Sequence, residues 1–261
     1  MRDEMERRWK AQEWQLIAPT PRAPAENLAL DEVLTVRVGS GERKPTLRFW
    51  GWSRQAVILG RFQSARNEIN ADVAAEHGID VVRRISGGGA MFVEPDGAIT
   101  YSIYVPDDFV QGMSFADSYE MFDHWVIDAL GELGVNAWYQ PLNDITSDAG
   151  KIGGAAQARR GGAVLHHTNM AYQMTTSLLG QVLRVGEEKL SDKGIRSAER
   201  RVGPLRNQTA LERDDIIYHL IGHFRSRFGL AADSLTDDEL AEMQRLVESQ
   251  FSTREWTYFL P

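Results

Sequence analysis

The chain of 261 residues contains no cysteine. It therefore has no disulfide, no metal site built on thiolates and no cysteine nucleophile. Long apolar runs are also missing, which excludes a membrane-spanning helix, and the first ten residues carry seven charged side chains where a signal peptide would be apolar. We expect a cytoplasmic protein that does not contact membranes.

Acidic side chains outnumber basic ones, and the net charge is −8. Residues 151–206 are an exception, with ten Lys and Arg side chains against four Asp and Glu. A basic region inside an acidic protein favours one specific anionic ligand over a polyanion, although a solvated arginine-rich loop has the same composition. We therefore expect no nucleic-acid partner.

The hydrophobic content of 43% is ordinary for a globular chain, and no linker or repeat divides it. We expect residues 1–261 to form a single catalytic domain without a C-terminal accessory domain, and residues 1–15 to be a charged, poorly packed lead-in. Prolines at 19, 21 and 24 should break the chain before the first helix.

Apolar periodicity and turn residues place the remaining elements. Helices are expected at 25–38, 70–77, 115–130, 175–185 and 214–228, and after a capping box at Thr236 and Glu239. Strands are expected at 46–50, 56–59, 79–84, 90–93, 98–105, 135–140 and 164–174. We expect the strands at 46–50 and 56–59 to form one hairpin, those at 90–93 and 98–105 another, and residues 144–154 a loop. Helices and strands in this irregular order favour an α+β fold with mixed or antiparallel sheets flanked by helices.

The stretch Arg83-Arg84-Ile85-Ser86-Gly87-Gly88-Gly89-Ala90 is hard to explain by packing, because glycines supply no side chain to bury. Their free backbone N–H groups suit an anion or a flat ligand, and two guanidinium groups suit a phosphate or carboxylate. A glycine-rich hairpin turn with solvated arginines is the alternative. The spacing matches neither a dinucleotide fingerprint nor a phosphate loop.

Two further segments carry candidate site residues. In Lys151-Ile152-Gly153-Gly154-Ala155-Ala156-Gln157, a lone lysine stands beside small residues, which suits a phosphate or carboxylate as well as a solvated turn. Asn143-Asp144 before it could bind a cation or an amine, or simply form a turn. Adjacent His166 and His167 on a strand should point to opposite faces, so zinc is not expected there.

In this order, these segments resemble the lipoate–protein ligase A family, relatives of the biotin ligases, over its catalytic domain only. The resemblance rests on Leu47-Arg48-Phe49-Trp50 and Leu59-Gly60-Arg61-Phe62-Gln63, the arginine–glycine stretch, Asn143-Asp144-Ile145, residues 151–157, Leu165-His166-His167, Lys193-Gly194-Ile195-Arg196-Ser197 and Arg201-Val202.

The resemblance implies an α+β catalytic domain that activates lipoate with ATP to lipoyl-AMP and passes the lipoyl group to a carrier lysine. Lys151 would be the catalytic residue that contacts the adenylate phosphate and acyl carbonyl. The residues implied to bind substrate and ATP are Arg83, Ser86, Gly87, Gly88, Gly89, Ala90, Asn143, Asp144, Gly154, Ala155 and His167. Mg²⁺ bridging the ATP phosphates would be the metal, held mainly by the nucleotide and by Asp144.

The expected partners are lipoyl carrier domains of 2-oxoacid dehydrogenases or the H protein of glycine cleavage. Three departures from the family pattern affect function. Val93-Glu94 stands where family members commonly have a histidine, the chain ends near Trp256 where many ligases continue into a small domain, and related octanoyltransferases use a cysteine that is missing here. A separate accessory-domain protein could therefore be needed. A cysteine-independent lipoyl or octanoyl transferase and a non-catalytic adenylate-binding subunit remain the alternatives.

Overall fold

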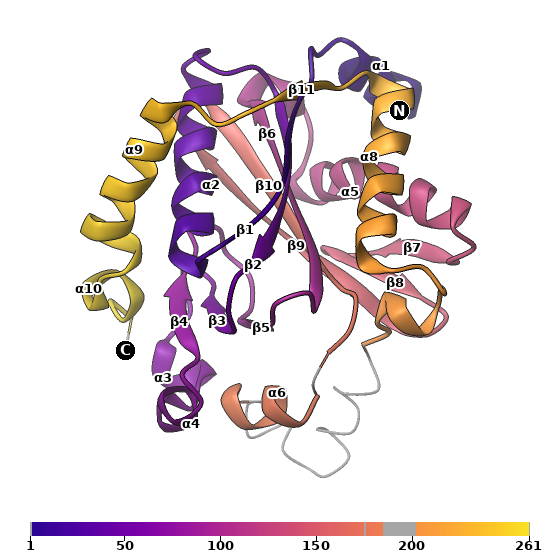
Figure 1. The fold of residues 1–261 in the computed structure, drawn as a ribbon. Coiled ribbons are helices and arrows are strands. Elements are labelled where there is room, and N and C mark those ends of the chain that lie inside the picture. The colour runs from indigo at the N-terminus through magenta and orange to yellow at the C-terminus, as the bar shows by residue number, and fades with distance from the viewer. Residues whose placement is uncertain (1, 175, 185–201, 261) are drawn as a thin grey trace.

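A computed structural model describes residues 2–174, 176–184 and 202–260 of the chain (Figure 1). The strands form an eight-stranded sheet, ordered β11-β1-β2-β6-β10-β9-β8-β7, and a three-stranded sheet, ordered β4-β3-β5. Both sheets mix parallel and antiparallel pairs, and helices cover them, so the expected α+β class is confirmed. The expected segment 193–197 and most of the basic loop lie outside the described residues.

The bounds of the strands follow the turns of the sequence. They are β1 Gln15–Arg22, β2 Thr46–Trp52, β3 Ala56–Leu59, β4 Asp80–Arg83, β5 Met91–Val93, β6 Ala98–Pro106, β7 Ala137–Gln140, β8 Asp144–Ser147, β9 Gly150–Arg160, β10 Ala163–Ala171 and β11 Ala231–Asp233.

The helices lie mainly on the two faces of the large sheet. They are α1 Arg2–Lys10, α2 Pro24–Gly39, α3 Ala65–Glu68, α4 Ala71–Glu76, α5 Phe115–Glu132, α6 Thr176–Val182, α8 Arg213–Phe228, α9 Asp237–Leu246 and α10 Arg254–Thr257, with short 3₁₀ turns at Asp107–Val110 and Leu205–Asn207 and a π-helical turn at Val247–Phe251. None of the helices in the described part of the chain has the length and apolar character needed to cross a membrane.

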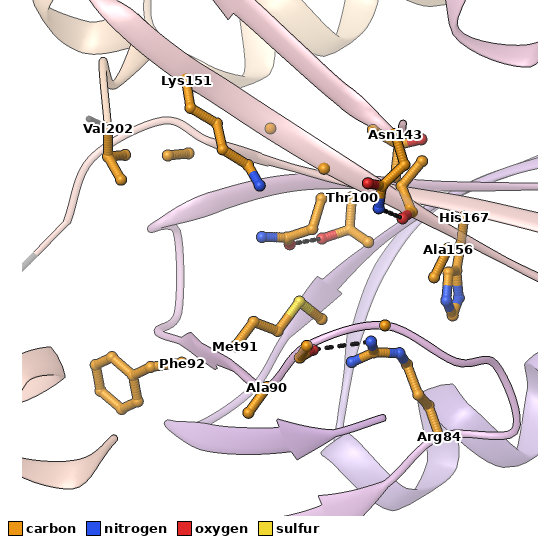
Figure 2. Close-up of a pocket in the computed structure, with 18 of the residues that line it drawn as sticks. Arg84, Ala90, Met91, Phe92, Thr100, Asn143, Lys151, Ala156, His167 and Val202 are labelled. Carbon is orange, nitrogen blue, oxygen red and sulfur yellow. Dashed lines mark hydrogen bonds between the residues drawn. The ribbon is translucent and has the colours of Figure 1, made fainter. Parts of the chain in front are cut away.

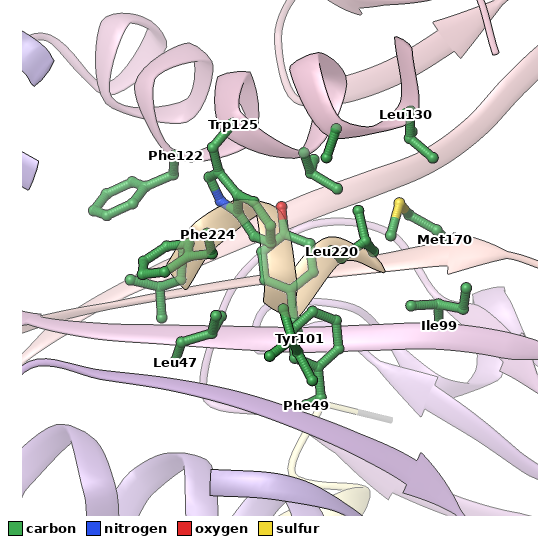
Figure 3. Packing of buried hydrophobic residues seen from close by; sticks show 14 of the residues in the cluster. Leu47, Phe49, Ile99, Tyr101, Phe122, Trp125, Leu130, Met170, Leu220 and Phe224 are labelled. Atoms are coloured by element: carbon green, nitrogen blue, oxygen red, sulfur yellow. The ribbon is translucent and has the colours of Figure 1, made fainter. Parts of the chain in front are cut away.

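Helices α5 and α8 cover one face of the large sheet, and α2 with α9 outside it covers the other (Figure 1). The larger hydrophobic core lies under α5 and α8, where aromatic rings from the helices meet strands β2 and β6 (Figure 3). Capping boxes at Ser114 and Thr236 begin α5 and α9, because each hydroxyl accepts the backbone N–H three residues later. The capping box predicted at Thr236 and Glu239 is confirmed.

Strand β6 lies near the middle of the large sheet, and both of its faces are buried. Ile99, Tyr101 and Ile103 enter the core under α5 and α8. Ser102 and Tyr104 point to the α2 side, where both hydroxyls donate to Asp31. The alternation of apolar and polar residues along 98–105 predicts a strand that is buried on one face only. The alternation is confirmed, but both faces are buried because α2 covers the polar side.

The N-terminal prediction is wrong. Residues 2–10 form helix α1, and Trp9 and Trp14 are buried against Phe109, Phe224 and Phe228. The prolines at 19 and 21 do not break the chain but lie within strand β1, whose N-terminal half pairs on both sides with β11 and β2. The high charge of residues 2–10 concealed the buried Trp9 of α1, and Trp14 just after it, from an argument based on composition.

Both predicted hairpins are also wrong. Strand β2 pairs with β1 and β6, whereas β3 pairs with β4 and β5 in the other sheet. Strand β5 likewise pairs with β3, and β6 pairs with β2 and β10. Short loops between adjacent strands suggested hairpins, but each loop carries the chain from one sheet to the other.

Residues 144–154 were expected to be a loop, but they form β8, a two-residue turn and the first half of β9. Their side chains are small or polar because one face of these strands borders a cavity. The low apolar content of this segment concealed the strand. Its backbone hydrogen bonds come from pairing of β9 with β10 over eight residue pairs.

We predict that Trp9→Ala lowers the free energy of unfolding by about 3–5 kcal/mol, because the ring packs among five other aromatic side chains of the core. Lys10→Ala on the exposed side of the same helix should change it by less than about 0.5 kcal/mol. Urea unfolding followed by circular dichroism measures both. Equal, small effects of the two changes would show that α1 is not part of the cooperative core.

Candidate functional site

The glycine triplet connects β4 to β5 and forms one wall of a cavity. Gly88 has φ of +89°, and a Cβ there would lie 2.9 Å from Nη2 of Arg84. A Cβ on Gly60 would lie 2.0 Å from the carbonyl oxygen of Gly88. Neither Gly60 nor Gly88 has room for a side chain, so the loop that carries the triplet packs directly on the backbone at Gly60.

Arg84 fixes the shape of this loop from inside. Its Nη2 donates to the carbonyls of Gly87 at 2.6 Å and Gly89 at 2.9 Å, and its Nε donates to the hydroxyl of Ser86 at 3.1 Å. Burial lowers the pKa of the guanidinium to about 10, so it stays charged at neutral pH. Among the described residues no carboxylate forms an ion pair with it. Its positive charge at the cavity wall is balanced only by dipoles.

Arg83 was predicted to bind the ligand, but the structure places its neighbour Arg84 on the cavity wall instead. Successive side chains of a strand point to opposite faces. The Arg83 side chain is fully buried on the other side of β4, where it donates to the carbonyls of Gly60, Gln63 and Thr257. The arginine pair was recognised from sequence. The resemblance assigned the ligand contact to Arg83, whereas Arg84 is the arginine on the cavity wall.

The cavity has a volume of about 330 Å³ and lies between the triplet and strands β8, β9 and β10 (Figure 2). That volume falls at the lower end of the range for small-molecule sites. Its inner end reaches the buried Leu28, Trp50 and His167, and its outer end reaches Lys151 and Val202. The rest of the wall is mostly apolar or small, from Gly88, Gly89, Ala90, Met91, Phe92, Gly153, Gly154, Ala155, Ala156, Ala171, Met174, Leu179 and Leu183.

Lys151 is the most exposed charged group of the cavity wall, and Figure 2 shows its side chain extending along the strands. Its Nζ lies 2.7 Å from Oδ1 of Asp144, and a Cβ on Gly154 would meet both atoms at 3.2 and 3.4 Å. Gly154 therefore leaves the space in which this ion pair forms. Asn143 closes the other side, because its backbone and side chain both bond to Ala155.

A β-bulge gives Lys151 its direction. Asp144 pairs with Gly154 and Ile145 with Gly153, but Thr146 pairs with Lys151, so β9 has one extra residue at Ile152. Lys151 and Gly154 are three residues apart and would face opposite ways in a regular strand. The extra residue turns the lysine to the side of Gly154 and the cavity. The backbone of Lys151 is held by Gly203, whose N–H donates to its carbonyl at 2.8 Å.

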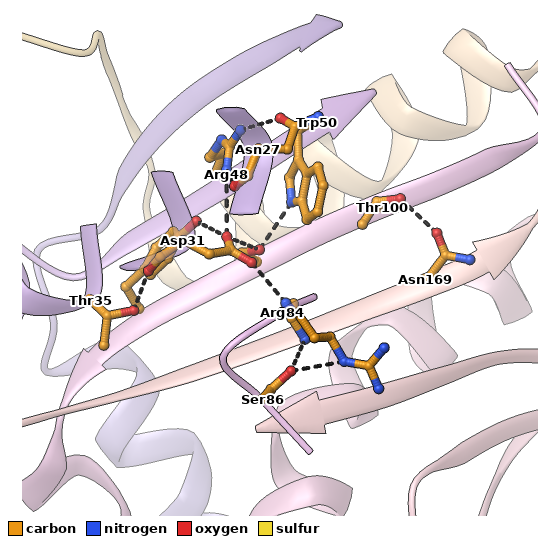
Figure 4. A network of polar contacts seen from close by, with 12 residues as sticks. Asn27, Asp31, Thr35, Arg48, Trp50, Arg84, Ser86, Thr100 and Asn169 are labelled. Carbon is orange, nitrogen blue, oxygen red and sulfur yellow. Dashed lines mark hydrogen bonds and ion pairs between the residues drawn. The ribbon is translucent and has the colours of Figure 1, made fainter. Parts of the chain in front are cut away.

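At the inner end, Asp31 of α2 is the centre of a buried polar network (Figure 4). Its carboxylate accepts from Ser102, Tyr104 and Nδ1 of His167, at 2.9, 2.6 and 2.8 Å. Burial opposes its ionisation, but the hydrogen bond from His167 and the charge of Arg48 outweigh burial and hold the pKa of Asp31 below its ordinary value. The network therefore contains a fully buried carboxylate.

His167 joins this carboxylate to the glycine loop. With Nδ1–H donating to Asp31, the other ring nitrogen accepts from the hydroxyl of Ser86 at 2.7 Å, and Ser86 in turn accepts from Arg84. Burial lowers the pKa of His167 below 6.5, against the influence of Asp31. The cavity wall here is a neutral imidazole. His166 faces the opposite side, toward Asp123 under α5, which confirms the prediction for adjacent histidines.

The structure brings most of the predicted site residues together. Those on the cavity wall are Gly88, Gly89, Ala90, Asn143, Lys151, Gly154, Ala155 and His167. Ser86, Gly87 and Asp144 stand directly behind that wall in contact with Arg84, His167 or Lys151. Sequence reasoning missed Asp31 and Trp50. An acidic residue within the apolar stripe of helix α2 was the available signal for Asp31.

Metal ligands are sparse near the cavity. No cluster of three or more His, Asp or Glu side chains that could hold an ion occurs in the described part of the chain. Asp144 offers one carboxylate at the outer end, already paired with Lys151. A single carboxylate suits Mg²⁺ that keeps water and nucleotide oxygens as its other ligands, and it does not suit a metal bound by protein alone.

Comparison with known proteins agrees with this geometry. Residues 23–225 match the family described as lipoyl protein ligase A/B catalytic domain. An octanoyltransferase LipM of Exiguobacterium is 30% identical, over 94% of this chain and 98% of its own. The lipoate–protein ligase A subunit 1 of Thermoplasma acidophilum is also 30% identical, over 92% of this chain and 94% of its own.

Solved structures show the same fold. The bipartite lipoate–protein ligase of Thermoplasma acidophilum, studied with its E2 lipoyl domain, gives a TM-score of 0.85 at 30% identity, over 96% of this chain and 98% of its own. A lipoate–protein ligase of that organism with bound lipoic acid, covered completely, and a lipoate–protein ligase A with bound ATP, covered to 99%, both give 0.81 at 27% identity over 96% of this chain. The apolar cavity with its lysine and glycine loop thus occurs in a chain that belongs to the lipoyl protein ligase A/B catalytic-domain family.

Proposed function

We propose that this chain is an ATP-dependent lipoate–protein ligase, which activates lipoate to lipoyl-AMP and transfers the lipoyl group to a lysine of a carrier domain. One observation carries the proposal: Lys151 stands at the outer end of an apolar cavity in a chain without cysteine. Related structures with lipoic acid and with ATP support the choice of both substrates. The carrier would be a lipoyl domain of a 2-oxoacid dehydrogenase or a glycine-cleavage H protein.

The cavity suits an acyl chain with a charged head. The buried inner end, with Leu28, Trp50 and the neutral His167, takes the apolar tail, and Lys151 with the glycine loop takes the carboxylate and the nucleotide phosphate. Burial of apolar tail surface contributes about 25 cal/mol per Å².

In the first step, a lipoate carboxylate oxygen bonds to the α-phosphorus of ATP, and the bond to pyrophosphate breaks. Negative charge on the phosphoryl oxygens is shared by the Lys151 ammonium and by backbone N–H groups of the loop that carries the triplet. Lys151 must leave Asp144 to make this contact. Asp144 then becomes available to Mg²⁺ bound to the nucleotide, and we assign it that role.

In the second step, the neutral amine of the carrier lysine bonds to the acyl carbon, AMP leaves with the pair of electrons of the broken C–O bond, and the new amide nitrogen releases one proton to water. The Lys151 ammonium stabilises the acyl oxygen as it becomes negative. The half-exposed position of Lys151 at the outer end admits a lysine from another protein, whereas the tail remains enclosed.

The similarity to LipM octanoyltransferases favours one alternative, a transferase that moves an octanoyl or lipoyl group without ATP. The chain has no cysteine to carry the acyl group, so such a transfer would have to be direct. A subunit that binds adenylate without turnover is the other alternative. The bipartite relative supports adding a separate accessory-domain protein to each assay.

We predict that Lys151→Ala lowers lipoate-dependent exchange of labelled pyrophosphate into ATP about 10²- to 10³-fold, because one charge contact to the transition state is lost. Lys44→Ala, an exposed lysine paired with Glu13 away from the cavity, is the matched control and should leave exchange unchanged. Wild-type protein that shows no exchange, even with an accessory-domain protein, would refute adenylation, and acyl transfer without ATP would establish the transferase alternative.

We predict that lipoate binding weakens as the pH falls below 6.5. Burial, Arg84 and His166 oppose the charge on His167 while Asp31 favours it, and burial dominates, so the pKa is lowered. The imidazole is neutral above 6.5 and gains a proton, beside the apolar tail, only as the pH falls through the lowered pKa. Calorimetric titration with lipoate between about pH 7.5 and about pH 5 measures this. His167→Gln, which keeps both hydrogen bonds, should remove most of the dependence, and equal slopes in both proteins would contradict the assignment.

A further inference from the structure

The C-terminal segment, residues 254–260, packs behind the strand that leads into the glycine triplet. The Trp256 indole donates to the carbonyl of Arg83 at 2.8 Å, and the carbonyl of Thr257 accepts from Nε and Nη2 of Arg83 at 2.9 and 2.7 Å. The ring of Phe259 lies 4.8 Å from the same guanidinium. The C-terminal segment therefore contacts Arg83 through both backbone and side chains.

The other end of the Arg83 guanidinium bonds to the 60–63 turn. Its Nη1 donates to the carbonyls of Gly60 at 2.8 Å and Gln63 at 2.7 Å. Arg83 is fully buried, and none of the described carboxylates forms an ion pair with it. The side chain is thus a bridge between two backbone segments, because a guanidinium donates in several fixed directions at once.

The 60–63 turn in turn supports the cavity wall. Gly60 lies so close to Gly88 that a Cβ would be 2.0 Å from the Gly88 carbonyl oxygen, and the N–H of Arg61 donates to the carbonyl of Ser86 at 2.8 Å. The Arg61 guanidinium lies 4.4 Å from the ring of Trp256 and 4.3 Å from that of Phe259. Contacts therefore run without interruption from the C-terminal segment to the triplet.

We propose that the C-terminal segment holds the glycine loop in its ligand-binding shape, with Arg83 as the positioning residue that transmits this support. Arg83 lies on the other side of β4 and does not line the cavity. The identity of the ligand rests on the proposed function, but the support of the loop does not. Loosening the bridge should leave the chain folded, because Phe259 is 41% exposed and lies at the edge of the structure.

Hydrogen exchange of the backbone amides of residues 86–90, measured by mass spectrometry without ligand, tests the support directly. Arg83→Lys keeps the positive charge but cannot donate to all the carbonyls that the guanidinium contacts. This change and Phe259→Ala should both speed the hydrogen exchange. In the same variants KM for lipoate should rise by up to about 100-fold with kcat changed less, because a small displacement of a binding loop has effects of that size. The effect of the double variant should fall short of the product of the two single effects, because Phe259 and Arg83 contact each other.

Phe115→Ala is the matched control, since this ring is also exposed and stacks 4.2 Å from an arginine, Arg159, outside the cavity wall. Phe115→Ala should change neither the hydrogen exchange of residues 86–90 nor KM for lipoate. Unchanged exchange of residues 86–90 in Arg83→Lys and Phe259→Ala would overturn the proposal, as would multiplicative effects in the double variant or equal changes in the control. Faster exchange in a protein without lipoate-dependent activity would support the positioning role and refute the proposed function separately.

Discussion

The burial of the Arg84 guanidinium, which has no carboxylate partner among the described residues, is the constraint on which the site depends. A buried cation is costly unless its N–H groups are satisfied, and here carbonyls of its own loop and the Ser86 hydroxyl accept them. The loop must therefore curl around the guanidinium, which explains why a glycine is needed at 88. The same charge, without a carboxylate partner among the described residues, gives the adjacent cavity a standing preference for anions.

A second constraint comes from α2. Asp31 is ionised in the interior because Arg48 and several hydroxyl and imidazole donors surround it, and its position fixes His167, which fixes Ser86. Helix α2, strand β10 and the glycine loop are thereby tied together although they are far apart in the sequence. Asp31, Ser86 and His167 at the inner end of the cavity are each held by partners that are themselves buried.

Local patterns were sufficient for most helices, the alternation along β6 and the opposite directions of His166 and His167. They failed where pairing is decided over long distances. Two hairpins were predicted, from β2 with β3 and from β5 with β6. Only the three-dimensional arrangement shows that their loops cross between sheets. The segments around the glycines and Lys151 were identified from sequence, because those residue types have few structural uses, but Asp31 was not, since its partners lie on strands remote in the sequence.

The bulge in β9 makes the location of Lys151 a property of chain length as well as residue type. Inserting or removing one residue between Lys151 and Gly154 would keep the lysine and the pairing of β9 with β10, yet turn the ammonium to the other face of the sheet. An aligned lysine in a relative is therefore informative only when the spacing to the following glycine pair is preserved. Within this strand, counting residues carries as much functional information as identifying them.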